Sequence, residues 1–104
     1  MFTKQINPTF TATVEIPVPG NTPDPVSFTF KAKTADAFDA LVKEVQSGDK
    51  TIADAVREVV AGWTHPAVEF SPERLEECFN RLPGSTLAIW SKYRQELFEG
   101  RRKN

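Results

Sequence analysis

The stretch FTATVEIPVPGNTPDPVSFTFKAK, residues 10–33, contains two segments in which apolar and polar residues alternate strictly. A period of two places one set of side chains on the buried face of a β-strand and the other set in solvent. We therefore expect an antiparallel hairpin over residues 8–33. Its inward side chains are Phe10, Ala12, Val14 and Ile16 in the first strand and Val26, Phe28, Phe30 and Ala32 in the second.

Residues 17–25, PVPGNTPDP, join these strands and hold four prolines around Gly20. Proline donates no ladder hydrogen bond and fixes φ, so both strands should end at this loop. The loop is either a stiff surface connection or a protruding binding loop that becomes ordered in an assembly. We favour the surface connection, because loop composition alone is weak evidence of binding.

After Lys33 the apolar period changes from two to about 3.6, which predicts a helical region over residues 34–100. Capping residues, prolines and glycines divide this region into about four helices. The second helix should bury Val56, Val59, Val60 and Trp63 on one face. We expect the four helices at Thr34 to Gly48, Thr51 to Gly62, Ser71 to Leu82, and Ser85 to Gly100. Ser85 is the expected cap at the start of the fourth helix.

Composition limits the class of protein. The 104 residues are 39% hydrophobic and 26% charged, with 13 Lys and Arg against 14 Asp and Glu. A chain of this length forms one domain, so residues 1–104 should fold as a single α+β domain with the hairpin first. We find no secretory signal and no apolar run long enough to span a membrane. A cytoplasmic protein is expected, and the single cysteine is compatible with that.

Residues that could support catalysis are few. His65 follows a predicted helix and precedes a proline, so we interpret it as a loop residue, and Cys78 falls on an apolar stripe as a small core side chain. Glu76 and Glu77 point about 100° apart on a helix and indicate a solvated face. We expect no catalytic site, no metal site and no cofactor.

The helix expected over residues 85–100 has a wider apolar surface than the other three. Its apolar residues cover an arc of roughly 180°, against roughly 100° for the others, and Arg94 interrupts them. One interpretation is a central helix that packs on two internal elements. The other is a partner-binding surface, because Trp, Tyr and Arg are frequent in interface hot spots.

The basic tail RRKN, residues 101–104, gives the C-terminal region local positive charge. Positive charge at the end of a helix is favourable and aids solubility. Nucleic-acid binding is the weaker alternative, since the net charge is −1 and no binding motif is present.

Taken in order, these features resemble the tail assembly chaperones of long-tailed bacteriophages. The resemblance covers most of the chain, with a Phe-rich hairpin, a GW segment, a Pro-Gly turn before a helix with a central Tyr, and a terminal Asn. It departs from that pattern at Trp90 and at Arg102 and Lys103. The matching positions are Gly62, Trp63, Pro83, Gly84, Ile89, Tyr93 and Asn104.

The resemblance implies a non-enzymatic protein of a phage or prophage that acts in the host bacterial cytoplasm and is absent from the mature virion. Its implied partners are the tape measure protein, which it keeps soluble, and the tail tube protein, which it helps to recruit. The resemblance is compatible with a homo-oligomer, and neither nucleic acid nor a membrane is expected as a partner. The candidate partner-binding residues are Trp90, Tyr93, Arg94, Leu97, Phe98, Arg101 and Arg102.

Two other classes of protein compete with this interpretation. A structural tail or connector component would persist in the virion, whereas a chaperone would leave before completion. A small regulatory nucleic-acid binder would use the C-terminal basic segment and would show strongly salt-dependent retention on DNA.

Overall fold

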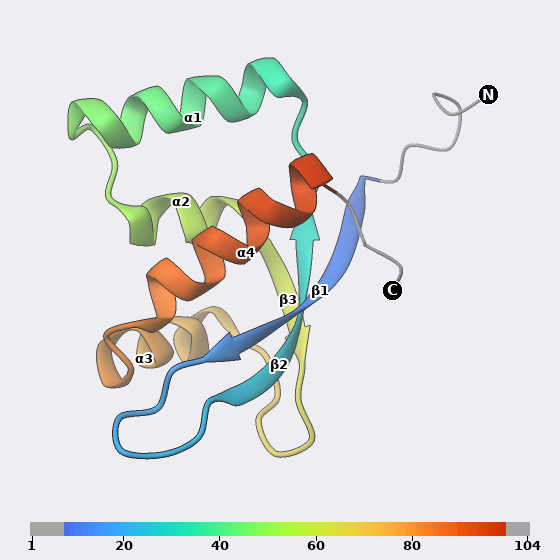
Figure 1. The fold of residues 1–104 in the computed structure, drawn as a ribbon, viewed down its shortest axis with the longest axis vertical. Helices are drawn as coiled ribbons and strands as arrows, with labels where there is room; N and C mark the ends of the chain where they lie inside the picture. The colour runs from blue at the N-terminus through green and yellow to red at the C-terminus, as the bar shows by residue number, and fades with distance from the viewer. Residues whose placement is uncertain (1–7, 100–104) are drawn as a thin grey trace.

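The computed structural model describes residues 8–99, which form a three-stranded sheet and four helices (Figure 1). The predicted α+β class and the N-terminal hairpin are confirmed. No helix within residues 8–99 is long and apolar enough to cross a membrane. In chain order the elements are β1 (Thr9–Ile16), β2 (Asp24–Lys31), α1 (Ala35–Ser47), α2 (Ile52–Val59), β3 (Val60–Thr64), α3 (Pro72–Arg81) and α4 (Ser85–Glu99).

The hairpin follows the alternation of the sequence. β1 pairs antiparallel with β2, and Val14 lies opposite Val26. The expected inward residues are buried, apart from Phe10 and Ala32, which are half-buried at the open end of the hairpin. The threonines of β1 lie on the opposite, exposed face, as a period of two requires.

The proline-rich connection contains a tight turn. The Asn21 amide donates to the Val18 carbonyl at 3.0 Å, and Gly20 between them has φ +76°. Proline before a glycine of positive φ is the usual composition of a type II turn, so Pro19 and Gly20 account for its geometry. The surrounding loop is mostly exposed.

The second helix is shorter than predicted, because the chain leaves the helix after Val59. Val60–Thr64 forms β3, which pairs antiparallel with β2 and places Trp63 opposite Phe28. Two consecutive β-branched valines and Gly62 disfavour a helix here, and the free edge of β2 provides hydrogen bonds for a strand. The helical spacing of Val60 and Trp63 was therefore misleading.

The helix ends agree with most of the predicted signals. The Thr34 side chain accepts from the Ala37 amide at the start of α1, and Gly48 ends that helix with φ +89°. Ser71 caps α3 ahead of a proline. Ser85 differs, because it is the first residue of α4 and its hydroxyl donates to the Cys78 carbonyl at 3.3 Å. The expected stop at Gly100 lies outside the described residues.

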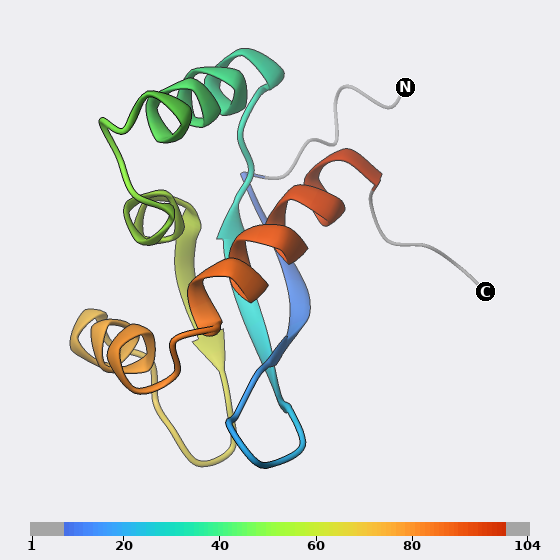
Figure 2. The ribbon, with the colours of Figure 1, turned by 60° about the vertical axis from the view of Figure 1, so that its left-hand side comes forward.

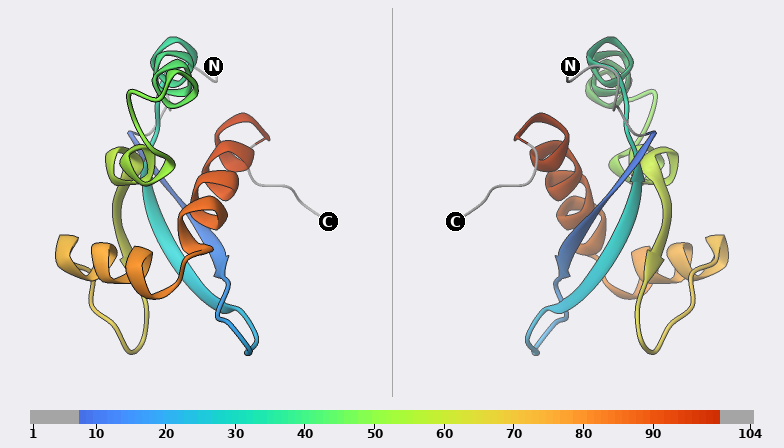
Figure 3. Two further views of the ribbon diagram at one scale, coloured as in Figure 1. Left: turned by 90° about the vertical axis from the view of Figure 1, so that its left-hand side faces the viewer. Right: turned by 90° about the vertical axis from the view of Figure 1, so that its right-hand side faces the viewer.

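The core lies between the sheet and α4. Figure 2 shows α4 running diagonally across the strands, and Figure 3 shows it to one side of them. α4 contacts both β1 and α2, while α1 packs on α2. The largest fully buried side chains are Tyr93, Phe28, Phe30, Leu41 and Ile89. Helix four is thus a central element of the fold.

Candidate protein-binding surfaces

The structure places two of the predicted partner-binding residues in the core. Tyr93 is 0% exposed, and its hydroxyl donates to the Lys31 carbonyl at 2.9 Å. Burial, with a smaller effect of the Glu58 charge, raises the pKa of Tyr93 to about 12. Trp90 is 6% exposed and stacks on Phe38, with ring centroids 5.7 Å apart. Both side chains attach α4 to the rest of the fold and present little surface to a partner.

Three other predicted residues form a patch near the end of α4. We call Arg94, Leu97 and Phe98 the α4-end patch. Phe98 is 63% exposed, and its ring meets Phe38 edge-on at 5.0 Å between centroids. Arg94 is exposed and Leu97 is half-buried. Arg101 and Arg102, which were predicted to extend this surface, lie outside the described residues.

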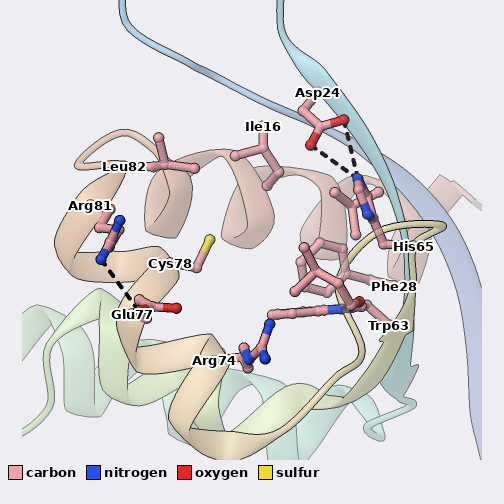
Figure 4. Close-up of a pocket in the computed structure, with 12 residues that line it drawn as sticks. Ile16, Asp24, Phe28, Trp63, His65, Arg74, Glu77, Cys78, Arg81 and Leu82 are labelled. Atoms are coloured by element: carbon pink, nitrogen blue, oxygen red, sulfur yellow. Dashed lines mark hydrogen bonds and ion pairs between the residues drawn. The ribbon is translucent and has the colours of Figure 1, made fainter.

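A groove separates α3 from the sheet at the other end of the molecule. This α3 groove has a volume of about 240 Å³ and opens to solvent. In Figure 4, residues of α3 face residues of the strands and of the loop after β3 across it. Its walls are largely apolar and include Ile16, Val26, Phe28, Trp63, Cys78 and Leu82.

The sequence of α3 explains why the groove is not filled. Leu75 is the only buried residue of this helix. The side that faces the groove carries the small Cys78 between longer polar residues, so no large apolar side chain closes the gap. Burial raises the pKa of the Cys78 thiol, which reduces the amount of reactive thiolate near neutral pH.

Trp63 forms a fixed wall of the groove. Its indole Nε1 donates to the Val68 carbonyl at 2.9 Å. Its ring meets Phe70 and Phe28 edge-on, with centroids 4.9 and 5.7 Å away. These contacts hold the indole in one orientation while part of it stays accessible, which is the state of many interface anchor residues.

The rim of the groove is charged. His65 Nδ1 accepts from the Ala67 amide at 3.0 Å, so the neutral ring carries its proton on Nε2, 3.1 Å from Asp24 Oδ2. Arg81 and Glu77 form an exposed pair at 3.6 Å. Arg74 also lines the groove, and within residues 8–99 its side chain has no acidic partner.

Sequence reasoning missed the groove, although α3 carried one usable signal. Arg74, Cys78 and Arg81 follow the spacing i, i+4, i+7 and therefore share one face of the helix. A small residue between two long cations leaves a hollow if that face points at another element. Whether it does depends on tertiary packing, which the helical spacing does not specify.

Metal binding finds no support among the described residues. Within residues 8–99 no group of three or more His, Cys, Asp or Glu side chains is arranged to hold an ion. His65 and Cys78 line the same groove but belong to different walls. The groove offers apolar walls for contact and charged side chains at its rim.

An open apolar groove and an exposed aromatic patch on a small α+β fold are features of a protein that contacts other proteins. A family model described as phage tail assembly chaperone matches residues 1–104, the whole chain. The chain belongs to this family, as the resemblance of its sequence implied. Comparison with curated proteins and with solved structures gave no match.

Proposed function

We propose that this chaperone binds the tape measure protein of its phage during tail assembly, keeps it soluble and helps recruit tail tube subunits. The observation that carries the proposal is the family match over residues 1–104. A long helical partner exposes apolar segments before it is packaged, and such segments aggregate unless another protein covers them. The proposed role requires no catalytic residue, metal or cofactor.

The α4-end patch supports the proposal because it combines an exposed aromatic ring with a cation. Phe98 leaves 63% of its surface in solvent, although Phe38 packs edge-on against its ring. A supported aromatic residue beside Arg94 gives a partner helix both a large apolar contact and a charged contact at the margin. We assign this patch to the tape measure protein.

Co-expression tests the proposed function directly. The tape measure protein should appear mainly in the soluble fraction when this chain is present and mainly in the insoluble fraction when it is absent. Equal solubility in the two cultures would refute the proposal.

A pair of variants tests the assigned surface. Phe98→Ser should reduce the soluble yield of the tape measure protein, because it removes the largest apolar contact of the patch. Leu87→Ser is the matched control, since Leu87 is 57% exposed near the opposite end of α4. If the two variants behave alike, the α4-end patch is not the tape measure site.

The alternative function, a structural component of the tail, predicts a different fate for the protein. As a chaperone, the protein should act in the host cytoplasm during assembly and be absent from the finished virion. Mass spectrometry of purified particles should detect the tail tube protein and not this chain. Stoichiometric recovery of the chain from particles would favour the structural role.

A further inference from the structure

The α3 groove is a second surface, separate from the α4-end patch. In Figures 1 and 2 α3 lies in the lower half of the molecule, whereas the C-terminal end of α4 lies in the upper half, below α1. The groove therefore needs its own occupant. Trp63, which belongs to the GW segment noted in the sequence, lies in its wall.

The size and lining of the groove indicate a side chain as the occupant. Pockets for small molecules and cofactors usually enclose about 300–1,000 Å³, whereas this groove measures about 240 Å³ and is open. Its inner surface is formed by Phe28, Trp63 and other apolar side chains. One large apolar residue of another polypeptide fits this combination of volume and chemistry.

The rim indicates which charge accompanies that residue. Arg74 has no acidic partner within the described part of the chain, and Arg81 is held by Glu77 at 3.6 Å in an exposed pair. Such a pair contributes little stability, so Glu77 can be replaced by a carboxylate of a ligand. The negative charge of Asp24 is already directed at His65 Nε2, 3.1 Å away. Arg74 is therefore the cation that a ligand carboxylate can reach directly, and Arg81 becomes available when Glu77 is displaced.

The spacing of the two arginines indicates the shape of the ligand. Arg74 and Arg81 are seven residues apart on α3, which corresponds to about 10 Å or two helical turns. A helix laid along α3 repeats this spacing. It can direct one apolar residue into the groove and one carboxylate toward each arginine.

We propose that the α3 groove binds an amphipathic helix of a partner protein, with a large apolar anchor between Trp63 and Cys78 and acidic residues one turn before and after the anchor. The inference rests on the proposed function only in assigning the helix to another tail protein. Direct binding of a peptide does not depend on that assignment.

A synthetic helical peptide tests the proposal. It carries one Phe with a Glu one turn to each side, and two control peptides carry Phe→Ala or Glu→Lys at those positions. Cys78 is the single thiol of the chain and lines the groove, so its alkylation by a maleimide reports occupancy. At a peptide concentration about ten times Kd, alkylation should slow by about tenfold. Neither control peptide should protect the thiol at the same concentration.

Charge-reversal variants locate the site. Arg74→Glu should weaken binding of the Phe–Glu peptide by about tenfold, because it removes one charged contact and adds repulsion. Lys43→Glu is the matched control, because Lys43 on α1 is 73% exposed and lies outside both surfaces, and it should change Kd by less than about twofold. Both side chains are exposed, and thermal melting checks that each variant is folded.

Two results would overturn the proposal. One is unchanged Cys78 alkylation at a peptide concentration that saturates binding. The other is an equal loss of affinity in Arg74→Glu and Lys43→Glu. Neither result bears on co-expression with the tape measure protein, so failure of the groove assignment is distinguishable from failure of the proposed function.

Discussion

Trp90 and Phe98 lie eight positions apart on one helix, yet their surroundings predict opposite responses to truncation. Trp90 stacks on Phe38 and Tyr93, with centroids 5.7 and 5.8 Å away, and is almost fully buried. Trp90→Ala should lower the free energy of unfolding by about 3–5 kcal/mol, as for large aromatic residues in cores. Phe98→Ala should cost less than about 1 kcal/mol, because most of that ring is in solvent.

Denaturant unfolding of the two variants measures this difference. The sequence interpretation of Trp90 as a partner contact instead requires a small loss of stability with a large loss of binding. A cost below about 1 kcal/mol for Trp90→Ala would restore that interpretation and would contradict the packing seen between α4 and α1.

The origin of the wide apolar arc on α4 was ambiguous at the level of sequence. Large apolar residues occur both in the core of a protein and at its partner-binding surfaces. The sequence therefore does not distinguish Tyr93 from Phe98. The structure separates them, because Tyr93 is buried and donates to the Lys31 carbonyl, whereas Phe98 is 63% exposed. Most of the arc is explained by internal packing, and the end of the helix retains the exposed part.

At the scale of secondary structure, local signals identified every element except β3. Alternation identified the hairpin, and caps at Thr34 and Ser71 located the starts of α1 and α3, because these interactions join residues close in sequence. β3 depends on pairing of Trp63 with Phe28, which is distant in sequence. A period analysis does not detect such a partner. The α3 groove was missed for the same reason, since its walls belong to separate elements.

Two glycines provide a test at this scale. Gly48 ends α1 with φ +89°, a conformation that a residue with a Cβ adopts only with strain, so Gly48→Ala should cost about 1 kcal/mol. Gly62 in β3 does not have a left-handed φ, and an added Cβ would make ordinary contact with Phe70 at 3.8 Å. Gly62→Ala should therefore change stability by less than about 0.5 kcal/mol.

Thermal or denaturant unfolding compares these two variants. An equal cost of about 1 kcal/mol at both positions would indicate that Gly62, like Gly48, ends a helix in the left-handed conformation, as the sequence predicted.

At the scale of the whole molecule, a small network of charges joins segments that are far apart in sequence. The Glu58 carboxylate on α2 forms ion pairs with Lys33 at 2.7 Å and with Lys50 at 2.8 Å. Lys33 precedes α1 in the chain, and Lys50 precedes α2. Lys50 also contacts Glu44 on α1 at 3.2 Å. The network therefore fixes how α1 and α2 attach to the end of the sheet, and partial burial strengthens it relative to a fully exposed pair.

This network predicts how stability responds to acid. Hydrogen bonds from Lys33 and then Lys50 lower the pKa of Glu58 in the folded chain. In the unfolded chain a glutamate has a pKa of about 4.3. At neutral pH the carboxylate is charged in both states, and the folded state benefits from the ion pairs. As the pH falls below about 4.3, Glu58 is protonated in the unfolded chain before it is protonated in the folded chain. Stability therefore decreases until the pH is below the pKa of Glu58 in the folded chain.

Glu58→Gln should therefore lower stability at neutral pH and flatten the decrease between neutral and acidic pH. Urea unfolding at a series of pH values measures both effects. Glu69→Gln serves as the matched control, because Glu69 is exposed in the loop before α3 and is outside this network. If Glu58→Gln and the wild-type chain lose stability in parallel as the pH falls, the ion pairs of Glu58 do not hold α1 and α2 in place. The attachment of these helices would then rest on apolar contacts such as those of Leu41 and Val56.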